Sequence, residues 1–265
     1  MASDSSHWYD DNCRAVFAVP NKSKGGTRPT KITDAREMKL LPSVTTILSI
    51  LAKPQLDRWK QEQVCLATQR TEKLPGEDAM AYLGRCLDAA FEQVDTAADL
   101  GTDIHEALEQ HFTGKPYAPH LATYVEAVDK WVRSEGIIFD AHELRLASRS
   151  HGFAGTTDAK IRCKRGRGIL DFKSRKTQPG KPCLPYDTQP MQIAAYHVAA
   201  YSLLPSPLVD GEGPDIGVNV FISTTEPGRV EACWYDHTQL QAEWRAFAAV
   251  RDIWVHLKGY DPRKV

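Results

Sequence analysis

The sequence predicts an α/β fold in which helices flank a central mixed β-sheet. Apolar residues recur with helical spacing through much of the first half of the chain, and apart from one short N-terminal segment the strand patterns begin near Ile137. A helical segment then separates these strands from two further strand patterns, an order that fits helices layered on one sheet. The 265 residues are 42% hydrophobic, which is enough for one substantial core, so we expect a single domain.

The N-terminal half predicts mostly helices. We expect a strand over residues 8–19, a Lys/Gly-rich loop over 21–29, and helices over 43–51, from 54 onward and over 78–112. Ser43 is a suitable N-cap, and Pro54 suits a first helical turn. The last helical pattern is expected to break at Leu100–Gly101, where Thr102 would cap a new helix.

The C-terminal half predicts strands with helices between and after them. A periodic helix over 121–135 has Tyr124, Val128, Trp131 and Val132 on its apolar side. We then expect strands over 137–146, a β-hairpin through 155–173, a helix over 188–203, a loop over 205–214, strands over 216–223 and 229–235, and a helix over 237–257.

The expected hairpin carries two acids and a lysine. Asp171 and Lys173 are two residues apart, so in a strand their side chains leave the same face, while Phe172 points to the other. Asp158 lies on the preceding strand and can face them. Two carboxylates within reach of one another can hold a hard divalent cation, and an ammonium group beside them can orient a water molecule.

Helical segments flank the hairpin on both sides. His105 and Glu109 are four residues apart and share a helix face, and so do Gln192 and Tyr196. Taken alone, His105 is better explained as an ordinary helix histidine, and only its place in the order of the motifs favours a metal ligand. The segment 105–111 also resembles a zinc peptidase helix, but that motif needs a second histidine where this chain has Glu109, so a peptidase ranks far below a nuclease.

Together these elements resemble the RecB-like branch of the PD-(D/E)XK nuclease superfamily. The four motifs of that branch match, in order, Gly101 with His105, Gly155 with Asp158, Asp171 with Lys173, and Gln192 with Tyr196. The resemblance spans residues 42–201. The segments 42–48 and 56–59 are similar to the opening of phage-encoded exonucleases of this branch and of the mitochondrial genome-maintenance exonuclease.

The resemblance implies a restriction-endonuclease-like core over residues 101–265, preceded over residues 1–100 by a strand, a loop and a helical arch. It also implies hydrolysis of DNA with one or two Mg²⁺ or Mn²⁺ ions. His105, Asp158, Asp171 and the backbone carbonyl of Phe172 would hold the metal, and Lys173 would position the attacking water. Gln192 and Tyr196 would hold the DNA or orient the lysine. Glu109 and Glu143 are further candidate ligands, although Glu143 is equally well explained as a surface acid of a strand.

An exonuclease acting on linear or single-stranded DNA in replication, recombination or repair is the preferred function, and a phage-encoded enzyme is compatible with it. The helical sequence before His105 could roof the cleft into a passage for a strand end. The alternatives are a structure- or partner-dependent endonuclease and a non-catalytic DNA-binding module with the same fold. A recombinase, annealing protein or helicase would be a natural partner.

Charge and composition narrow the partners further. The 33 Lys and Arg nearly balance the 34 Asp and Glu, so only a local basic track for DNA is expected. The candidates for DNA contact are Lys160, Arg175, Lys176, Arg58 and Trp59. Core packing is the simpler role for Trp59, and the basic residues near the hairpin turn are equally well explained as a solvated tip.

The six cysteines lack Cys-x-x-Cys spacing and the C-terminal trio that holds an iron–sulfur cluster in some relatives, so neither a zinc ribbon nor a cluster is expected. We expect no membrane association, because the sequence contains no long apolar run and no signal-peptide pattern. The acidic opening argues against a mitochondrial presequence. The expected location is the cytoplasm of a prokaryote or of a phage-infected host cell.

Overall fold

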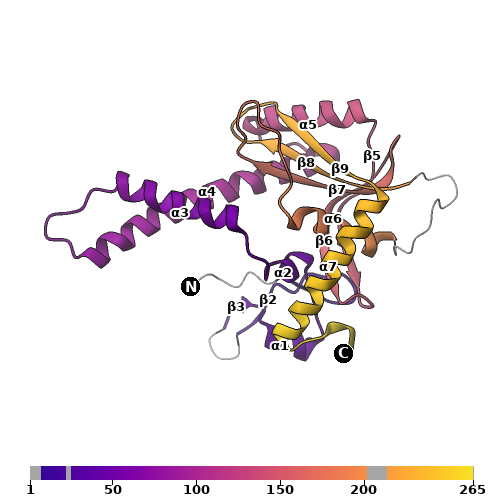
Figure 1. The fold of residues 1–265 in the computed structure, drawn as a ribbon, viewed down its shortest axis with the longest axis horizontal. Coiled ribbons are helices and arrows are strands. Elements are labelled where there is room, and N and C mark those ends of the chain that lie inside the picture. The colour runs from indigo at the N-terminus through magenta and orange to yellow at the C-terminus, as the bar shows by residue number, and fades with distance from the viewer. Residues whose placement is uncertain (1–6, 22–24, 202–213, 265) are drawn as a thin grey trace.

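A computed structural model describes residues 7–21, 25–201 and 214–264. Its centre is a five-stranded sheet with the order β5-β6-β7-β8-β9 (Figure 1). The strands are β5 (Ile138–Ser148), β6 (Phe153–Cys163), β7 (Gly166–Arg175), β8 (Asp215–Ser223) and β9 (Val230–Tyr235). Only the β7–β8 pair is parallel, so the sheet is mixed, as the sequence predicts.

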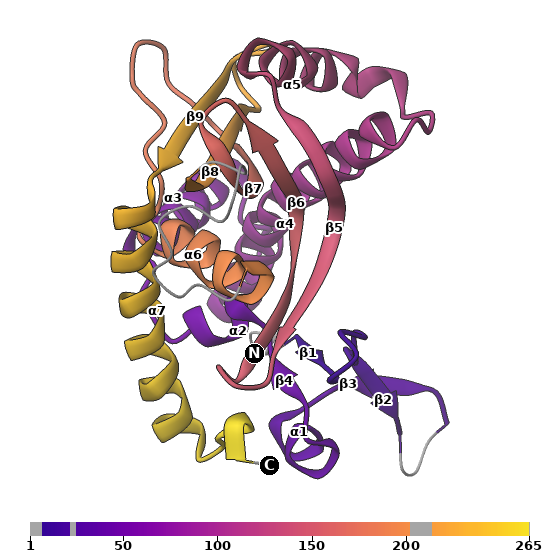
Figure 2. The same cartoon turned by 90° about the vertical axis from the view of Figure 1, so that its right-hand side faces the viewer.

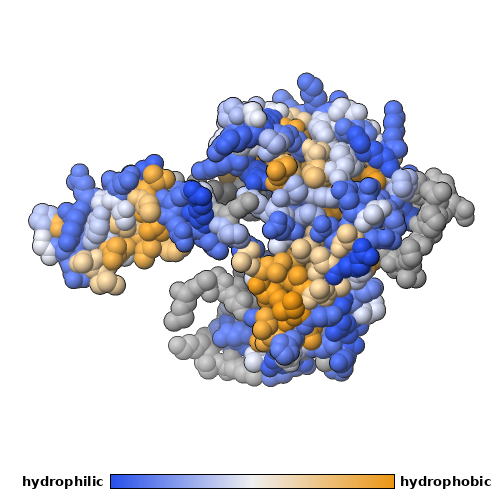
Figure 3. Space-filling view, in the orientation of Figure 1, coloured by the Kyte–Doolittle hydropathy of each residue, from blue (hydrophilic) through white to orange (hydrophobic). Residues whose placement is uncertain are grey.

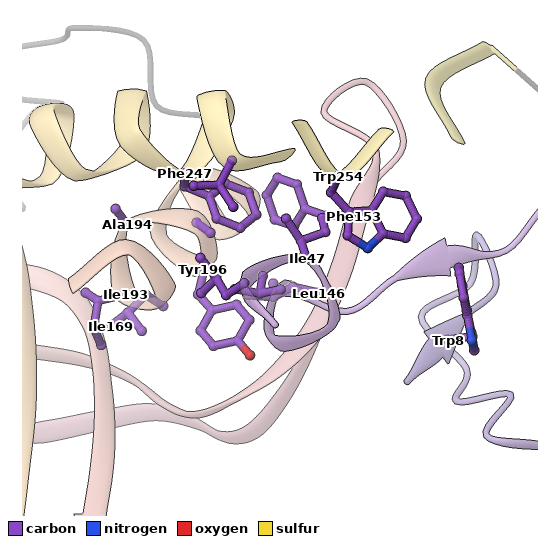
Figure 4. Packing of buried hydrophobic residues seen from close by; sticks show 14 of the residues in the cluster. Trp8, Ile47, Leu146, Phe153, Ile169, Ile193, Ala194, Tyr196, Phe247 and Trp254 are labelled. Atoms are coloured by element: carbon purple, nitrogen blue, oxygen red, sulfur yellow. The ribbon is translucent and has the colours of Figure 1, made fainter. Parts of the chain in front are cut away.

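Helices cover both faces of this sheet, as Figure 2 shows. On one face, the C-terminal part of α4 (Ala79–Phe112) and α5 (Ala122–Glu135) pack on Leu170, Phe172 and Val218. On the other face lie α6 (Thr188–Tyr201), which connects the parallel strands, and α7 (His237–Lys258). Each face encloses its own apolar core. Figure 4 shows part of the second core, in which Phe153, Tyr196 and Phe247 come from three different elements.

The N-terminal segment forms small elements at one end of the sheet. Strand β1 (Trp8–Tyr9) pairs antiparallel with β4 (Leu41–Pro42), and β2 (Ala18–Pro20) pairs antiparallel with β3 (Thr27–Pro29). Helix α1 (Ile32–Met38) lies between β3 and β4 in the chain. The single strand predicted over 8–19 is therefore wrong. The chain turns instead at Cys13, which has a positive φ of 59°, after Asp10 accepts hydrogen bonds from the backbone of Asn12 and Arg14.

Helices α2 (Val44–Leu48) and α3 (Pro54–Arg70) begin where the sequence predicts. The side chain of Ser43 accepts a hydrogen bond from the backbone N–H of Thr46 and so caps α2. Two 3₁₀ turns complete the secondary structure, η1 (Pro119–Leu121) before α5 and η2 (Pro262–Lys264) after α7. The predicted loop over 205–213 and the predicted end of the helix at 202–203 lie outside the described residues.

The break predicted at Leu100–Gly101 is also wrong, because α4 runs without interruption from Ala79 to Phe112. Thr102 is consequently an interior residue of the helix and not its N-cap. A Cβ atom added at Gly101 would lie 2.8 Å from the Ser174 Oγ. The glycine thus lets the helix approach β7 closely, and the boundary expected at residue 100 falls inside one helix.

Helix α3 and the first part of α4 form a hairpin that extends away from the sheet (Figure 1). We call this hairpin, residues 54–92, the arm. Among its described side chains only Ala67, Cys86 and Ala90 are buried. Apolar side chains gather along part of its surface in Figure 3, and the most exposed of them are Leu66, Leu74, Met80, Leu83, Leu87 and Phe91.

None of the helices in the described part of the chain combines the length and the apolar composition that crossing a bilayer requires.

Candidate functional site

The candidate site lies where strands β6 and β7 separate. The two strands pair from Cys163↔Gly166 to Ala159↔Leu170, and beyond that point β6 pairs with β5 while β7 pairs with β8. Asp158 and Asp171 are the first residues past the last β6–β7 pair. The separation of the strands therefore places one acid on each side of an opening in the sheet.

Asp171 is buried and contacts two side chains. Lys173 Nζ lies 2.6 Å from its Oδ2 atom, and Asn219 Nδ2 donates to the same oxygen over 3.0 Å. This confirms that Asp171 and Lys173 share a face of β7, while Phe172 packs in the core on the other face. Burial raises the pKa of Asp171, as does the charge of Asp158, and Lys173 opposes both.

Lys173 is a protonated ammonium group in this environment. Burial alone would lower the pKa of Lys173, but the carboxylates of Asp171 and Asp158 outweigh that effect and hold the pKa above its ordinary value. The lysine therefore supplies positive charge to the site and a donor to whatever binds beside Asp171.

Asp158 links the opening to helix α4. Its Oδ2 atom accepts a hydrogen bond from the backbone N–H of Phe172 over 2.5 Å and lies 3.5 Å from the Nδ1 atom of His105. Burial would raise the pKa of Asp158, but the neighbouring His105 and Lys173 outweigh it and lower the pKa. Burial likewise would lower the pKa of His105, and Asp158 raises it instead. The imidazole and the carboxylate thus stabilise each other's charge.

The carbonyl group of Phe172 faces the same opening. In an extended strand the N–H and C=O groups of one residue point to the same side, and the N–H of Phe172 points toward Asp158. The sequence-based assignment of this carbonyl as a metal ligand is consistent with that direction.

Two further acids face the cavity in front of the opening. Glu143 on β5 and Glu109 on α4 both line it. Partial burial and the charges of Asp158 and Glu109 raise the pKa of Glu143 to about 7. Glu143 also has a positive φ of 45°, which is unusual for a residue other than glycine and is often found at functional sites. Four carboxylates line this cavity against two cationic side chains, Lys173 and Arg145, so acidic groups are in excess there.

Gln192 and Tyr196 lie side by side on α6. Gln192 Nε2 donates to the Tyr196 hydroxyl over 3.3 Å, and both residues line the cavity. A Cβ atom at Gly155 would lie 2.6 Å from the Tyr196 ring. Gly155 therefore lets the tyrosine side chain, rather than backbone or a ligand, approach β6 closely.

The cavity has a volume of about 590 Å³ and brings distant segments together. Its lining includes the acids and Lys173 from the sheet and α4, together with His7, Tyr9 and Phe17 from the N-terminal segment. A second hollow of about 280 Å³ shares Lys173, Gln192 and Thr45 with it and is also lined by Leu56 and Tyr186. The two hollows therefore adjoin at these shared residues.

The residues predicted to contact DNA have different surroundings. Trp59 lies at the base of the arm, with the Lys176 Nζ 6.0 Å from its ring centroid. Arg58 pairs with Glu62 on the exposed side of α3. The Arg175 guanidinium stacks on Tyr186 and donates to the carbonyl of Leu184, and Lys160 lies over the ring of Tyr201.

Sequence reasoning missed Asn219, which is fully buried in β8. Its side chain donates to Asp171 and accepts a hydrogen bond from the Tyr235 hydroxyl over 2.9 Å. An asparagine in the middle of an otherwise apolar strand is a detectable signal. Its partner is not readable from sequence, because the parallel register Asp171↔Asn219 is set only by the fold.

The donor groups at the opening have the chemistry of a site for Mg²⁺ or Mn²⁺. Carboxylate oxygens, a carbonyl and an imidazole suit such ions. Two ligands of an octahedral ion lie about 3 Å apart, close to the 3.5 Å between His105 Nδ1 and Asp158 Oδ2. Within the described residues no three His, Cys, Asp or Glu side chains converge as a preformed cage. The ligand set is therefore proposed from donor type and position.

No protein-family model matches this chain, and no curated protein matches it. The functional conclusion therefore depends on the residues and geometry described above.

Proposed function

We propose that this protein is a divalent-metal-dependent deoxyribonuclease with a PD-(D/E)XK core. One observation carries the proposal. The buried carboxylate of Asp171 meets the half-buried side chains of Asp158 and Lys173 where two strands separate. All three line one cavity, and the imidazole of His105 lies beside Asp158. Uncompensated burial of such charges is costly. Their convergence at a cavity is more readily explained by ligand binding than by stability.

Asp158, Asp171, His105 and the carbonyl of Phe172 would hold the cation. Glu143 lies across from Asp158 between the pairs His142↔Ala159 and Leu144↔Thr157, and both it and Glu109 line the same cavity, so either would be a further ligand. When bound, a divalent cation would offset the charge of the acids, polarise the scissile phosphate and lower the pKa of a coordinated water.

Lys173 has the role of a fixed positive charge. The carboxylates of Asp171 and Asp158 hold its pKa above the ordinary value, which favours the protonated form. In that form it donates a hydrogen bond to the attacking water or to a phosphate oxygen and offsets charge that develops in the transition state. Gln192 and the Tyr196 hydroxyl can hold a phosphate oxygen on the α6 side of the cavity.

An exonuclease is the form of this activity that we favour. The N-terminal segment walls one side of the cavity and narrows the approach to the acids, which suits a strand end better than the middle of a duplex. The similarity of residues 42–59 to the opening of phage-encoded exonucleases supports the same choice.

Two substitutions separate the roles within the site. Asp171→Asn should abolish Mn²⁺-dependent DNA cleavage and weaken Mn²⁺ binding, because it removes a ligand charge while keeping the shape of the side chain. Lys173→Ala should also abolish cleavage but leave Mn²⁺ binding largely intact. Calorimetric Mn²⁺ titration and a cleavage assay on the same preparations measure both.

Circular dichroism of each variant serves as the folding control. A folded Asp171→Asn protein with normal turnover would contradict the proposed function. A loss of Mn²⁺ affinity in Lys173→Ala as large as that in Asp171→Asn would contradict the role given to the lysine.

A further inference from the structure

Part of the lining of the cavity is aromatic. His7 and Phe17 stack with ring centroids 4.4 Å apart and an interplanar angle of 26°, and Tyr9 meets Phe17 edge-on at 5.4 Å. All three residues line the same cavity as Asp158 and Lys173. We call the His7–Phe17 pair the aromatic shelf.

The aromatic shelf is held by hydrogen bonds on both sides. The backbone N–H of His7 donates to Thr46 Oγ1 over 2.9 Å, and its carbonyl accepts from the N–H of Ser43 over 2.8 Å. The backbone carbonyl of Phe17 accepts from Thr30 over 3.0 Å. These contacts fix the backbone at both residues, and the stacking of the two rings on each other limits their movement, so a ligand that stacks there would have less to order on binding.

Core packing does not account for the position of Phe17. Its neighbours Trp8 and Tyr9 are 1% and 4% exposed, whereas Phe17 is 41% exposed. Phe17 thus leaves part of a flat apolar ring exposed in the same cavity that the acids and Lys173 line. A nucleotide matches this combination, because its base has a flat face and its phosphate carries charge.

We propose that the aromatic shelf stacks an unpaired nucleobase and thereby makes the site select single-stranded nucleic acid. This inference rests on the proposed nuclease function and adds the class of substrate. Base stacking on an aromatic ring tolerates any sequence, since every base has a flat face. In a duplex both faces of an internal base are covered by neighbouring pairs. The cavity volume of about 590 Å³ lies in the usual range for small-ligand sites, and Arg145 on its rim can face the phosphate backbone.

The test distinguishes binding of the bases from binding of the phosphate backbone. A fluorescein-labelled thymidine 12-mer and an abasic 12-mer with the same phosphate backbone are titrated with Asp171→Asn protein in Mn²⁺-containing buffer, so that no strand is cut. Adding Phe17→Ala should weaken binding of the thymidine strand about 5- to 100-fold. Binding of the abasic strand should not change.

Matched variants show whether a loss of affinity is due to the flat face of the Phe17 ring. Phe17→Trp should retain affinity for the thymidine strand, whereas Phe17→Leu, which keeps an apolar side chain but no flat face, should lose it. Ile253→Ala is the control, because Ile253 is also an exposed apolar residue, at 53%, and does not line the cavity. If Phe17→Ala fails to fold, the Leu and Trp pair answers the same question.

Two outcomes would overturn the inference. Equal losses on the thymidine and abasic strands would mean that Phe17 supports the fold or the backbone contact, and unchanged affinity on both would mean that no base stacks there. Neither outcome affects the nuclease proposal, which is tested separately by cleavage of the same thymidine strand by wild type and Asp171→Asn. Loss of that cleavage difference would reject the nuclease and leave the binding result readable.

Discussion

The carboxylate of Asp171 has a lysine on its own strand and an asparagine on the next strand as partners. Both contact the same oxygen, at 2.6 and 3.0 Å, which leaves the other oxygen for a ligand. Asn219 is in turn held by the hydroxyl of Tyr235. The orientation of the acid is therefore fixed by a chain of side chains that begins on β9.

Asn219→Leu should destabilise the fold and reduce cleavage together. The leucine has a similar volume, but it removes a donor from Asp171 and leaves the buried Tyr235 hydroxyl without its acceptor. The expected loss is about 1–3 kcal/mol in the free energy of unfolding, measured by urea denaturation. The double variant Asn219→Leu/Tyr235→Phe should recover part of that stability but not the cleavage. Unchanged stability of the single variant would contradict the role given to this chain of hydrogen bonds.

His197 predicts how stability depends on pH away from the site. It is fully buried on α6, with its Nε2 atom 3.7 Å from the carboxylate of Asp215. Burial and the charges of Arg167 and His237 lower its pKa to about 4, despite Asp215. The unfolded chain, with an ordinary pKa near 6.5, therefore binds the proton first as the pH falls.

The free energy of unfolding should accordingly decrease between pH 6.5 and about 4, by up to about 3 kcal/mol from this residue. Above pH 6.5 the residue should have no effect. Urea denaturation of wild type and His197→Leu across this range measures its contribution as a difference between the two proteins. The comparison is needed because burial also lowers the pKa of His142 and His151, whereas Asp158 raises that of His105. Parallel pH profiles for the two proteins would contradict the assignment.

At the scale of elements, the hairpin that carries the acids follows from local sequence, and so does the shared face of Asp171 and Lys173. Asp171 and Lys173 alternate with the apolar residues Leu170 and Phe172, and this pattern can be recognised without knowing the partner strand. The point at which β6 and β7 separate cannot be predicted from local sequence. It depends on the pairing of β6 with β5 and of β7 with β8, which only the whole fold determines. Gly101 was misleading for a related reason: it permits close packing against β7 and does not interrupt α4.

The contact between β6 and α6 predicts the effect of one methyl group. Gly155→Ala would place a Cβ atom 2.6 Å from the Tyr196 ring, so we expect a loss of about 1–3 kcal/mol in stability and displacement of the tyrosine from the cavity. Gly84→Ala is the matched control, because nothing lies within 4 Å of its added Cβ and the residue is inside α4. It should stabilise the protein by about 0.5–1 kcal/mol. Thermal denaturation that fails to separate the two variants would refute this packing.

The arm should open locally more easily than the rest of α4. Its helices are joined by few buried residues and by contacts such as the Tyr82 hydroxyl to the carbonyl of Thr68, whereas Ile104 and Leu108 are buried against the sheet. Backbone amides before residue 92 should therefore exchange with deuterium well before those of residues 104–112. Mass spectrometry of peptides from the two parts of the helix measures this, and equal protection would show that the arm is as stable as the core.

At the scale of the whole molecule, the candidate site joins segments that are far apart in the chain. The order of motifs was sufficient to predict that His105, Asp158, Asp171, Lys173, Gln192 and Tyr196 gather. It was not sufficient to predict the aromatic part of the cavity lining, because the N-terminal segment reaches the cavity only through pairing of β1 with β4 and the tie between Tyr9 and Thr156. Local sequence patterns carry no information about which distant segments of the chain pair with each other.

The central claim is that the acids at the separation of β6 and β7 hydrolyse DNA from an end with a divalent metal. The most direct measurement is Mn²⁺-dependent digestion of linear single-stranded, linear duplex and closed circular DNA, with wild type and Asp171→Asn compared side by side. We expect wild type to degrade linear DNA only, with single strands preferred, and the variant to degrade none. Cutting of circles would contradict the exonuclease, and a pure, folded wild-type protein that digests no DNA would contradict the nuclease itself.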